Sequence, residues 1–489
     1  MSLSPVATDP VFTPDEVNLA PGATSICRVS PKPPCKLGLT ESVMVDAIEL
    51  SPVTPVNKQN YDSESRSVLS ARYRTQRTRE RIQFVTLCWF DYLEGWNDGS
   101  NGPLLPRIQK VYGVGYAVVS LIFVVACVGY ITGAVSNVIL AEKLGFGKVM
   151  VLGSLCQVLA YCIESTGPPF PVFVSAYFIN GIGIALQAVK FVHHHSSLLT
   201  REQNAHSVGY IACIKENAEV KMGVFMAVYG AGALSSPLVA TQFSHLPHWN
   251  LHFLTSLGIA ITNTIALIIV FRLKPQAECL SEIGIVDSDN DASEHSHLRQ
   301  IFANKNVHLL AAFTLLYVGA EVTLGGWIVT YIIDVRGGGP SSGYVSSGFF
   351  GGLMVGRVAL LWLNEKIGER LALFIYAVLI IIFEFIIWFL PFLIGDAIIV
   401  CVIGMLLGPM YPIIVNHARR VLPRRILTGS IGWISGLGQA GSALVPFMVG
   451  AIAQTAGMKT LQPVLIGILG IMTGLWVLVC YGSSSRRAD

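Results

Sequence analysis

The stretch FVTLCWFDYLEGWNDGSNGPLLP, residues Phe84–Pro106, is apolar enough to enter a membrane, yet it contains Asp91, Glu94 and Asp98. A charged side chain near the centre of a bilayer costs between about 3 and more than 10 kcal/mol. The spacing of the three carboxylates places them on one stripe of a helix. Because one stripe can face one water-filled cavity, we predict a transmembrane helix that lines a solute pathway.

The composition of the whole chain supports a membrane protein. Of its 489 residues, 52% are apolar and 13% are charged, and the mean hydropathy is +0.58. Soluble domains are typically about one quarter charged. The cysteines show none of the spacings of a zinc site, so we expect reduced thiols and no bound metal. The net charge is only +3, and no nucleotide-binding or catalytic motif appears. We therefore expect no enzyme activity, no cofactor and no nucleic-acid partner.

Apolar segments of spanning length recur from Arg81 onward. The predicted spans are residues 83–103, 114–140, 149–165, 171–192, 222–243, 250–272, 307–333, 342–363, 370–390, 394–416, 427–454 and 462–481. The loops on one side hold few basic residues, namely Arg107, Lys110, Arg336 and Lys459. Since Lys and Arg are enriched on the cytoplasmic side, we expect an all-α, twelve-helix membrane protein with both termini in the cytosol, most simply in the plasma membrane.

The predicted spans divide the chain into two halves. Six-helix bundles are expected at 81–273 and 307–481, joined by a polar cytosolic loop at 274–306. A cytosolic tail follows at 482–489. Residues 1–80 are rich in Pro, Ser and Thr, and they hold too few apolar residues to offset the entropy of folding. We expect this N-terminal tail to be disordered.

The two halves also resemble each other in sequence. The segment VGYITGAVSNVILAEKLG at 128–145 aligns without gaps to GGLMVGRVALLWLNEKIG at 351–368. Both contain two glycines four residues apart, and both end in Glu-Lys-x-Gly. Repeated six-helix halves are a transporter architecture, in which the solute is held near the midplane between the halves.

Several motifs carry a family resemblance. AEKLGFGK at 141–148 and NEKIGER at 364–370 look like the loop motif that the major facilitator superfamily repeats in each half. The longer motifs resemble a fungal branch of that superfamily, the fucose permease-like sugar:proton symporters. They are EGWNDGSNGPLLP at 94–106, GIGIALQ at 181–187, GPMYPIIVNHARRVLP at 408–423 and LTGSIGWISGLGQAGSALVPF at 427–447. The resemblance implies twelve helices and transport by alternating access. The first motif departs from the pattern, with Val138 and Glu142 where Gly and Asp are usual.

The resemblance also indicates which residues line the pathway. Asn97 and Asp98 match an Asn-Asp pair whose Asp serves transport in fucose permeases. The functional Glu of their fourth helix falls on Gln187, which cannot titrate, so the two-acid proton scheme does not transfer intact. A carboxyl group removed from water binds a proton more readily, and Asp91, Glu94 and Asp98 are therefore candidate proton carriers.

The seventh helix is the repeat mate of the first, and it carries Glu321 near the place of Asn97. Its face also holds Trp327 and Tyr331, which could cover the apolar side of a sugar ring or simply pack among helices. Gln439, in the eleventh helix, is a further candidate for the pathway wall. Of two other acids, Glu164 is expected to be solvated, and Glu384 is expected to have its hydrogen bonds satisfied in a structural role.

A cytoplasmic gate is predicted from the loop motifs. The pairs Glu142–Lys143 and Glu365–Lys366 are expected to latch the halves in one state, with Arg357 joining the latch. The segment AVKFVHHHSSLLTREQ at 188–203 interrupts the pattern of the fungal branch and is interpreted as an insertion. Its adjacent His residues point in different directions on a helix, which is unlike a metal site.

Together these features predict a secondary active transporter for a small polar solute, a sugar by analogy, moved together with protons. The expected partners are this solute, protons and membrane lipid, and the protein is expected to be a monomer. Two alternatives stay open: a proton-driven exporter of a drug or secondary metabolite, and a nutrient sensor that no longer transports. The fold alone does not choose between them.

Overall fold

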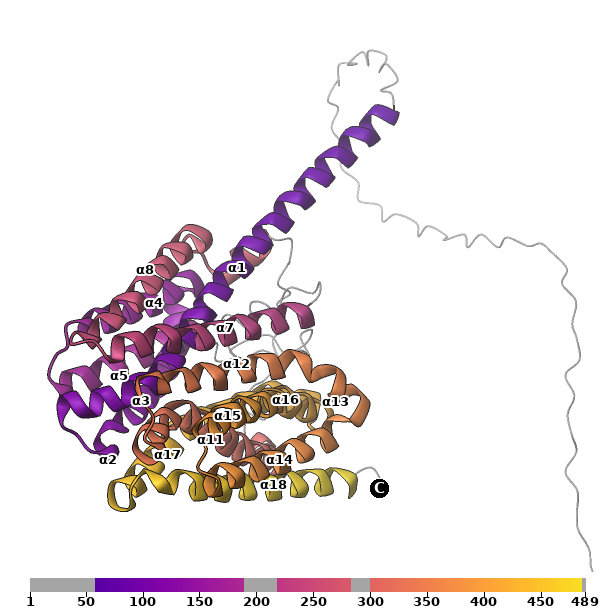
Figure 1. Cartoon of the computed structure of the whole chain (residues 1–489). Coiled ribbons are helices and arrows are strands. Elements are labelled where there is room, and N and C mark those ends of the chain that lie inside the picture. The colour runs from indigo at the N-terminus through magenta and orange to yellow at the C-terminus, as the bar shows by residue number, and fades with distance from the viewer. Residues whose placement is uncertain (1–57, 189–217, 283–299, 486–489) are drawn as a thin grey trace, which may run out of the picture. The chain divides into compact units, whose positions relative to one another are not determined.

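The computed structural model describes residues 58–188, 218–282 and 300–485, which form helices and turns without a β-strand (Figure 1). The chain divides into two compact units, Met1–Glu64 and Ser65–Asp489. Of the described residues, only 58–64, at the start of the first helix, belong to the first unit, and all the others lie in the second. The insertion predicted at 188–203 lies outside the described residues from position 189 onward.

The first half contains the helices that precede residue 283. They are α1 (Lys58–Tyr112), α2 (Tyr116–Val119), α3 (Leu121–Leu144), α4 (Phe146–Ser165), α5 (Phe170–Ala188), α7 (Ala218–Ser244), η1 (Trp249–Leu251), α8 (His252–Phe271) and α9 (Gln276–Glu282).

The second half begins at α11. Its helices are α11 (Lys305–Arg336), η2 (Pro340–Gly343), α12 (Tyr344–Ala359), α13 (Leu361–Ile367), α14 (Glu369–Phe389), α15 (Leu393–Leu407), α16 (Met410–Val421), α17 (Arg424–Ala456), η3 (Met458–Thr460) and α18 (Leu461–Ser485). In Figure 1 the two halves run from indigo to magenta and from orange to yellow, and α7 packs against α12 where they meet.

Ten stretches of the described residues are long and apolar enough to cross a membrane. The two remaining predicted spans are α1 and α12. In α1 the three carboxylates lower the hydropathy, and α12 has only 16 residues before the chain continues as α13. With these two helices, the predicted all-α membrane fold of two six-helix halves is confirmed.

The first helix begins earlier than the sequence indicated. Residues 58–80 were expected to belong to a disordered tail, but the helix starts at Lys58 and continues without a break to Tyr112. Of residues 58–80, nine are Arg, Gln or Glu, which are good helix formers. A helix that the membrane segment has already nucleated can therefore extend through this polar stretch.

Glycines allow the helices that carry the site to approach closely. A Cβ atom at Gly99 of α1 would overlap the carbonyl oxygen of Ala233 in α7. The second half repeats this contact, because a Cβ atom at Gly441 of α17 would overlap the carbonyl oxygen of Leu315 in α11. Small residues of this kind let the backbones of membrane helices touch. They fix α1 on α7 and α11 on α17.

Candidate functional site

The three acids of α1 were predicted to line the pathway; all lie inside the helix bundle, and Asp98 is the one that borders the cavity described below. Asp91 is only 5% exposed, whereas Glu94 and Asp98 are half-buried. Glu94 lies close enough to both of its neighbours to interact with them electrostatically. The Oδ2 atom of Asp91 has no hydrogen-bond partner among the described residues. The stripe therefore contains several carboxyl groups that compete for the same counter-charges and protons.

Asp98 is the best-connected member of the stripe. The Tyr229 hydroxyl of α7 donates a hydrogen bond of 2.7 Å to its Oδ2, and the Asn97 amide donates one of 3.4 Å to its Oδ1. The Oδ1 of Asn97 in turn accepts from Asn180 at 2.8 Å and from Tyr161 at 3.3 Å. Asn97 thus anchors α1 to α4 and α5, while Asp98 is held by α7.

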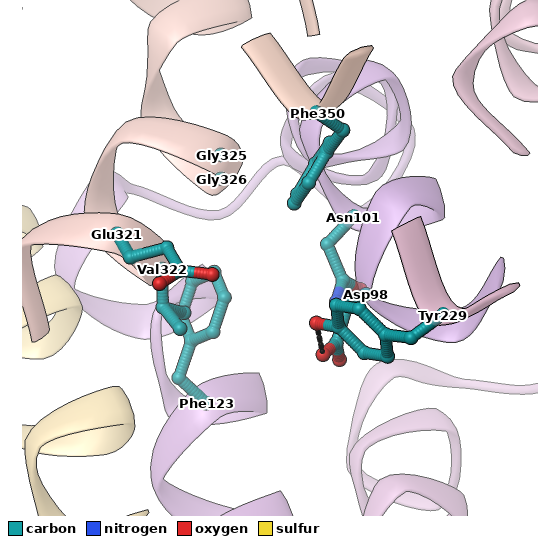
Figure 2. A pocket seen from close by; sticks show the side chains of 9 residues that line it. All are labelled: Asp98, Asn101, Phe123, Tyr229, Glu321, Val322, Gly325, Gly326 and Phe350. Carbon is teal, nitrogen blue, oxygen red and sulfur yellow. Dashed lines mark hydrogen bonds between the residues drawn. The ribbon is translucent and has the colours of Figure 1, made fainter. Parts of the chain in front are cut away.

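A cavity of about 30 Å³ lies between the two halves. Its lining comes from α1, α3, α7, α11 and α12: Asp98, Asn101, Phe123, Tyr229, Glu321, Val322, Gly325, Gly326 and Phe350. Figure 2 shows Glu321 and the Asp98–Tyr229 pair approaching this space from opposite sides. A volume of this size has room for about two water molecules, which is too small for a larger solute in this state of the protein.

Glu321 was predicted to face the pathway, and it lines the cavity with 9% of its surface exposed. Its partner is Arg357 of α12, whose Nη2 lies 3.7 Å from the Glu321 Oε1. The Arg357 guanidinium also lies over the Tyr229 ring, 5.4 Å from its centre. Arg357 therefore belongs to the central cluster and not to the cytoplasmic latch. The sequence grouped it with the latch because it lies close to the loop motif along the chain.

Gln187 was predicted on the pathway, but the structure places it inside the first half. It is fully buried, and its Nε2 donates to the Gln157 Oε1 at 2.7 Å. Its Oε1 accepts from the Asn263 amide at 3.1 Å. These partners belong to α4 and α8. Gln187 is therefore part of a polar network that holds the end of α5, and it does not line the cavity.

The aromatic candidates of α11 also lie away from the cavity. Trp327 is fully buried and donates from its Nε1 to the carbonyl oxygen of Pro446 at 3.1 Å. Tyr331 packs under the Arg336 guanidinium, 5.4 Å from the ring centre. Gln439 lies at a contact between the halves, where its backbone carbonyl accepts from the Cys127 thiol at 3.3 Å. Both aromatic rings therefore pack among helices.

Among the side chains that the structure describes, the predicted latch is not formed. The side chain of Glu142 lies outside the described residues. Lys143, Glu365 and Lys366 are exposed, and Lys366 Nζ lies 4.0 Å from the centre of the Trp362 ring. The latch therefore stays a prediction for another state of the protein.

Two further acids differ from expectation. Glu164 was expected to be solvated, but it is only 1% exposed, near Tyr161 and Tyr177. Glu384 was expected to be satisfied, but neither of its oxygens has a hydrogen-bond partner among the described residues. Helix ends that look solvent-facing in a sequence can be covered by neighbouring helices, as happens at Glu164.

Sequence reasoning missed most of the neutral lining of the cavity. Tyr229 stands among small residues in α7, and Phe123 and Phe350 stand in apolar runs. None of these positions differs by pattern from an ordinary lipid-facing or core aromatic residue. Asn101, by contrast, could have been found, because it lies one turn beyond Asn97 on the same stripe.

The two halves are joined at the end of the bundle that was predicted to face outward. The Tyr116 hydroxyl donates to Asp334 at 2.7 Å, and the Ala117 amide donates to the Gln454 side chain at 3.3 Å. His245 bonds the carbonyl oxygen of Pro340 at 2.6 Å. Each of these bonds joins a residue of the first half to one of the second.

Known proteins resemble this chain over most of its length. "Bypass of stop codon protein 6" of Saccharomyces cerevisiae is 25% identical over 432 residues, which cover 81% of this chain and 82% of the yeast protein. A glucose/galactose transporter of Brucella abortus is 24% identical over 398 residues, or 76% of this chain and 88% of that protein.

Solved structures share the fold. The nucleoside transporter NupG superimposes with a TM-score of 0.63 at 10% identity, over 81% of this chain and 99% of its own. The fucose:proton symporter of E. coli gives 0.53 at 16% identity, over 81% and 98% of the two chains. The family model described as Major Facilitator Superfamily matches residues 93–446, and the chain therefore belongs to that superfamily of transporters.

Proposed function

We propose that this protein moves a small polar solute, a sugar, across a membrane by alternating access, and that protons drive the movement. One observation carries the proposal: Asp98 of the first half and Glu321 of the second line the same cavity at the interface. Carboxylates accept hydrogen bonds from solute hydroxyls, and a carboxyl group in a dry site can bind and release a proton near neutral pH.

The position of the cavity fits a carrier that opens first to one side and then to the other. In this state the halves are joined near Tyr116 and Asp334. We propose that this end faces the outside and is closed, and that separation of the halves there admits the solute. The proposed units are residues 81–273 and 307–481, connected through 274–306.

The named relatives support a sugar as the solute, since one is a glucose/galactose transporter and a structural neighbour is a fucose:proton symporter. We further propose that the protein is a monomer in the plasma membrane, surrounded by lipid, with both termini in the cytosol. The excess of basic residues in the loops on the proposed inner side supports this orientation.

The experiment is uptake into proteoliposomes that contain the purified full-length protein. The probes are labelled D-glucose, D-galactose, L-fucose and a nucleoside, each with and without an inward proton gradient. We expect at least one sugar to accumulate only with the gradient, and Asp98→Asn to abolish the accumulation. Absence of gradient-dependent flux for every probe would contradict the proposal. Export of a drug-like cation against the gradient would favour the exporter instead.

A further inference from the structure

Four side chains connect the acids of the two halves through the interface. Glu321 of α11 pairs with Arg357 of α12 at 3.7 Å. Arg357 lies over the Tyr229 ring of α7, 5.4 Å from its centre. Tyr229 donates its hydroxyl hydrogen bond of 2.7 Å to Asp98 of α1. This series of side-chain contacts therefore begins at a carboxylate of the second half and ends at a carboxylate of the first.

The cluster around these contacts contains more acidic than basic groups. Arg357 faces Asp91 from α1, Tyr229 from α7 and Glu321 from its own half. Tyr317 of α11 and Tyr411 of α16 are its other titratable neighbours, and Glu94 lies beside Asp91 and Tyr130. The cluster thus contains four carboxyl groups, Asp91, Glu94, Asp98 and Glu321, and one guanidinium contacts it among the described residues.

A guanidinium stays charged over the whole accessible pH range. An ionised carboxylate that is buried without a counter-charge is strongly disfavoured. Arg357 carries one positive charge; its ion pair is with Glu321, and Asp91 interacts with it electrostatically without forming an ion pair. The α1 acids must therefore be balanced by something else, and in a proton-driven carrier that is the proton.

Tyr229 gives the two ends of the chain a physical connection. Ionised Asp98 only accepts hydrogen bonds, but protonated Asp98 is itself a donor. Proton binding at Asp98 therefore changes the bond that holds the Tyr229 hydroxyl, and the ring of Tyr229 is the surface on which Arg357 rests. A shift of this ring moves the cation that neutralises Glu321.

We propose that Arg357 is a positioning residue: it neutralises Glu321, so that proton binding falls to the acids of α1, and Tyr229 transmits the protonation of Asp98 to the Arg357–Glu321 pair. This inference rests on the proposed proton-coupled transport. It specifies which carboxylate does not bind the transported proton, which residue prevents it from doing so, and how protonation in one half affects the other half.

The test compares single and paired neutralisations. Arg357→Gln removes the cation, so protons bind the cluster more easily, and the pH of half-maximal sugar uptake should move to alkaline values by about one unit or more. Glu321→Gln frees the cation to pair with an α1 acid, and the profile should move to acidic values. The double variant R357Q/E321Q should return close to the wild-type profile.

Further variants separate charge from structure. Arg357→Lys should retain the wild-type direction of the profile because the charge stays, with weaker uptake because the planar fork is lost. Tyr229→Phe keeps the ring under Arg357 but removes the bond to Asp98, and it should shift the profile while the protein still folds. The matched control is Arg336→Gln, which breaks a different buried ion pair of the second half. It should lower stability and leave the profile unchanged.

A second readout requires no transported solute. Infrared difference spectra of the full-length protein in lipid nanodiscs, between about pH 5 and about pH 8, count carboxyl groups that gain a proton. R357Q should shift this titration to alkaline pH, E321Q to acidic pH, and R357Q/E321Q should restore it. Shifts of one sign in both single variants, or a double variant no closer to wild type, would overturn the inference. If no sugar is transported but the spectra behave as stated, the proposed function fails and the charge assignment stands.

Discussion

The two halves share a fold but hold themselves together by different means. In the first half, neutral polar side chains connect the helices. Ser154, Gln157, Gln187, Asn263 and Thr264 form one buried network between α4, α5 and α8. In the second half, the described interior is mostly apolar, and a buried ion pair joins Arg336 to Asp396 at 2.8 Å.

This difference shows that the two halves accommodate buried polar groups in different ways. Neutral amides and hydroxyls satisfy one another without changing state as the pH changes, so this network joins α4, α5 and α8 without an ionisable group. In the second half, Glu321 has its own cation, Arg357. In the proposed mechanism, the first half responds to protons through the acids of α1, and the second half presents the Arg357–Glu321 pair to them.

The largest expected effect comes from the contact that both halves share. Gly99→Val and Gly441→Val each place a side chain against a carbonyl oxygen of the partner helix, and each should prevent correct folding. Size-exclusion chromatography of a fluorescent fusion measures the folded fraction. The control is Gly470→Ala in α18, where a Cβ atom meets nothing within 4 Å. If the two valine variants differ widely in folded fraction, the halves do not depend equally on this packing.

The next largest effect is a loss of stability that is confined to the second half. Asp396→Leu leaves Arg336 buried without its counter-charge, which typically costs about 3–5 kcal/mol. The double variant R336M/D396L should recover most of the loss, because two apolar side chains can replace a buried ion pair. Thermal unfolding in detergent measures both. A double variant as unstable as the single one would show that the ion pair does more than balance charge.

A smaller effect is expected in the polar network of the first half. Gln187→Leu removes the hydrogen bonds to Gln157 and Asn263 and should lower stability by about 1–3 kcal/mol. The pH profile of uptake should stay that of the wild type, because Gln187 does not line the cavity. Asp98→Asn, measured beside it, should change the profile strongly. A changed profile in Gln187→Leu would return this residue to the pathway.

The smallest effect concerns the short helix α9 between the two halves. Burial alone would raise the pKa of Glu282, but hydrogen bonds from Lys274 and Arg79 outweigh it and lower the pKa below its ordinary value. Because the folded-state pKa is lowered, the stabilisation is present above the ordinary value for Glu, about 4.3, and is lost as the pH falls through the lowered pKa. The pair with Arg79 holds α9 near α1, and the pair with Lys274 ties α9 to the turn that follows α8.

Cys279 reports on this anchoring because it is only 1% exposed. Burial, and then the charge of Glu282, raise the pKa of the Cys279 thiol to about 11. Glu282→Gln should loosen α9 and speed maleimide labelling of Cys279 several-fold at neutral pH, measured by peptide mass spectrometry. Glu278→Gln is the matched control, since Glu278 contacts the same Lys274 from a more exposed position. Equal labelling in both variants would show that Glu282 does not anchor the helix.

Sequence reasoning located the helices and the two acids that face each other, because hydropathy and the cost of a buried charge act on single helices. It could not place Arg357 or Gln187, whose surroundings depend on how helices rotate against one another. Neighbourhood along the chain put Arg357 with the loop motif, and family resemblance put Gln187 on the pathway. The start of α1 was also missed, because helix propensity in a polar segment becomes decisive only next to an existing helix.

If the proposed solute binds between Asp98 and Glu321, the protein already occupies part of that site. The Tyr229 hydroxyl and the Arg357 guanidinium contact the two carboxylates that solute hydroxyls would have to reach, and they would compete with the solute. A solute gains only the difference between the bonds it makes and those it displaces. A ring with many hydroxyl groups can replace every lost bond, whereas an analogue that lacks one leaves a buried carboxylate unpaired and is rejected. Selectivity then arises from what a wrong solute fails to restore, without a tightly fitted shape.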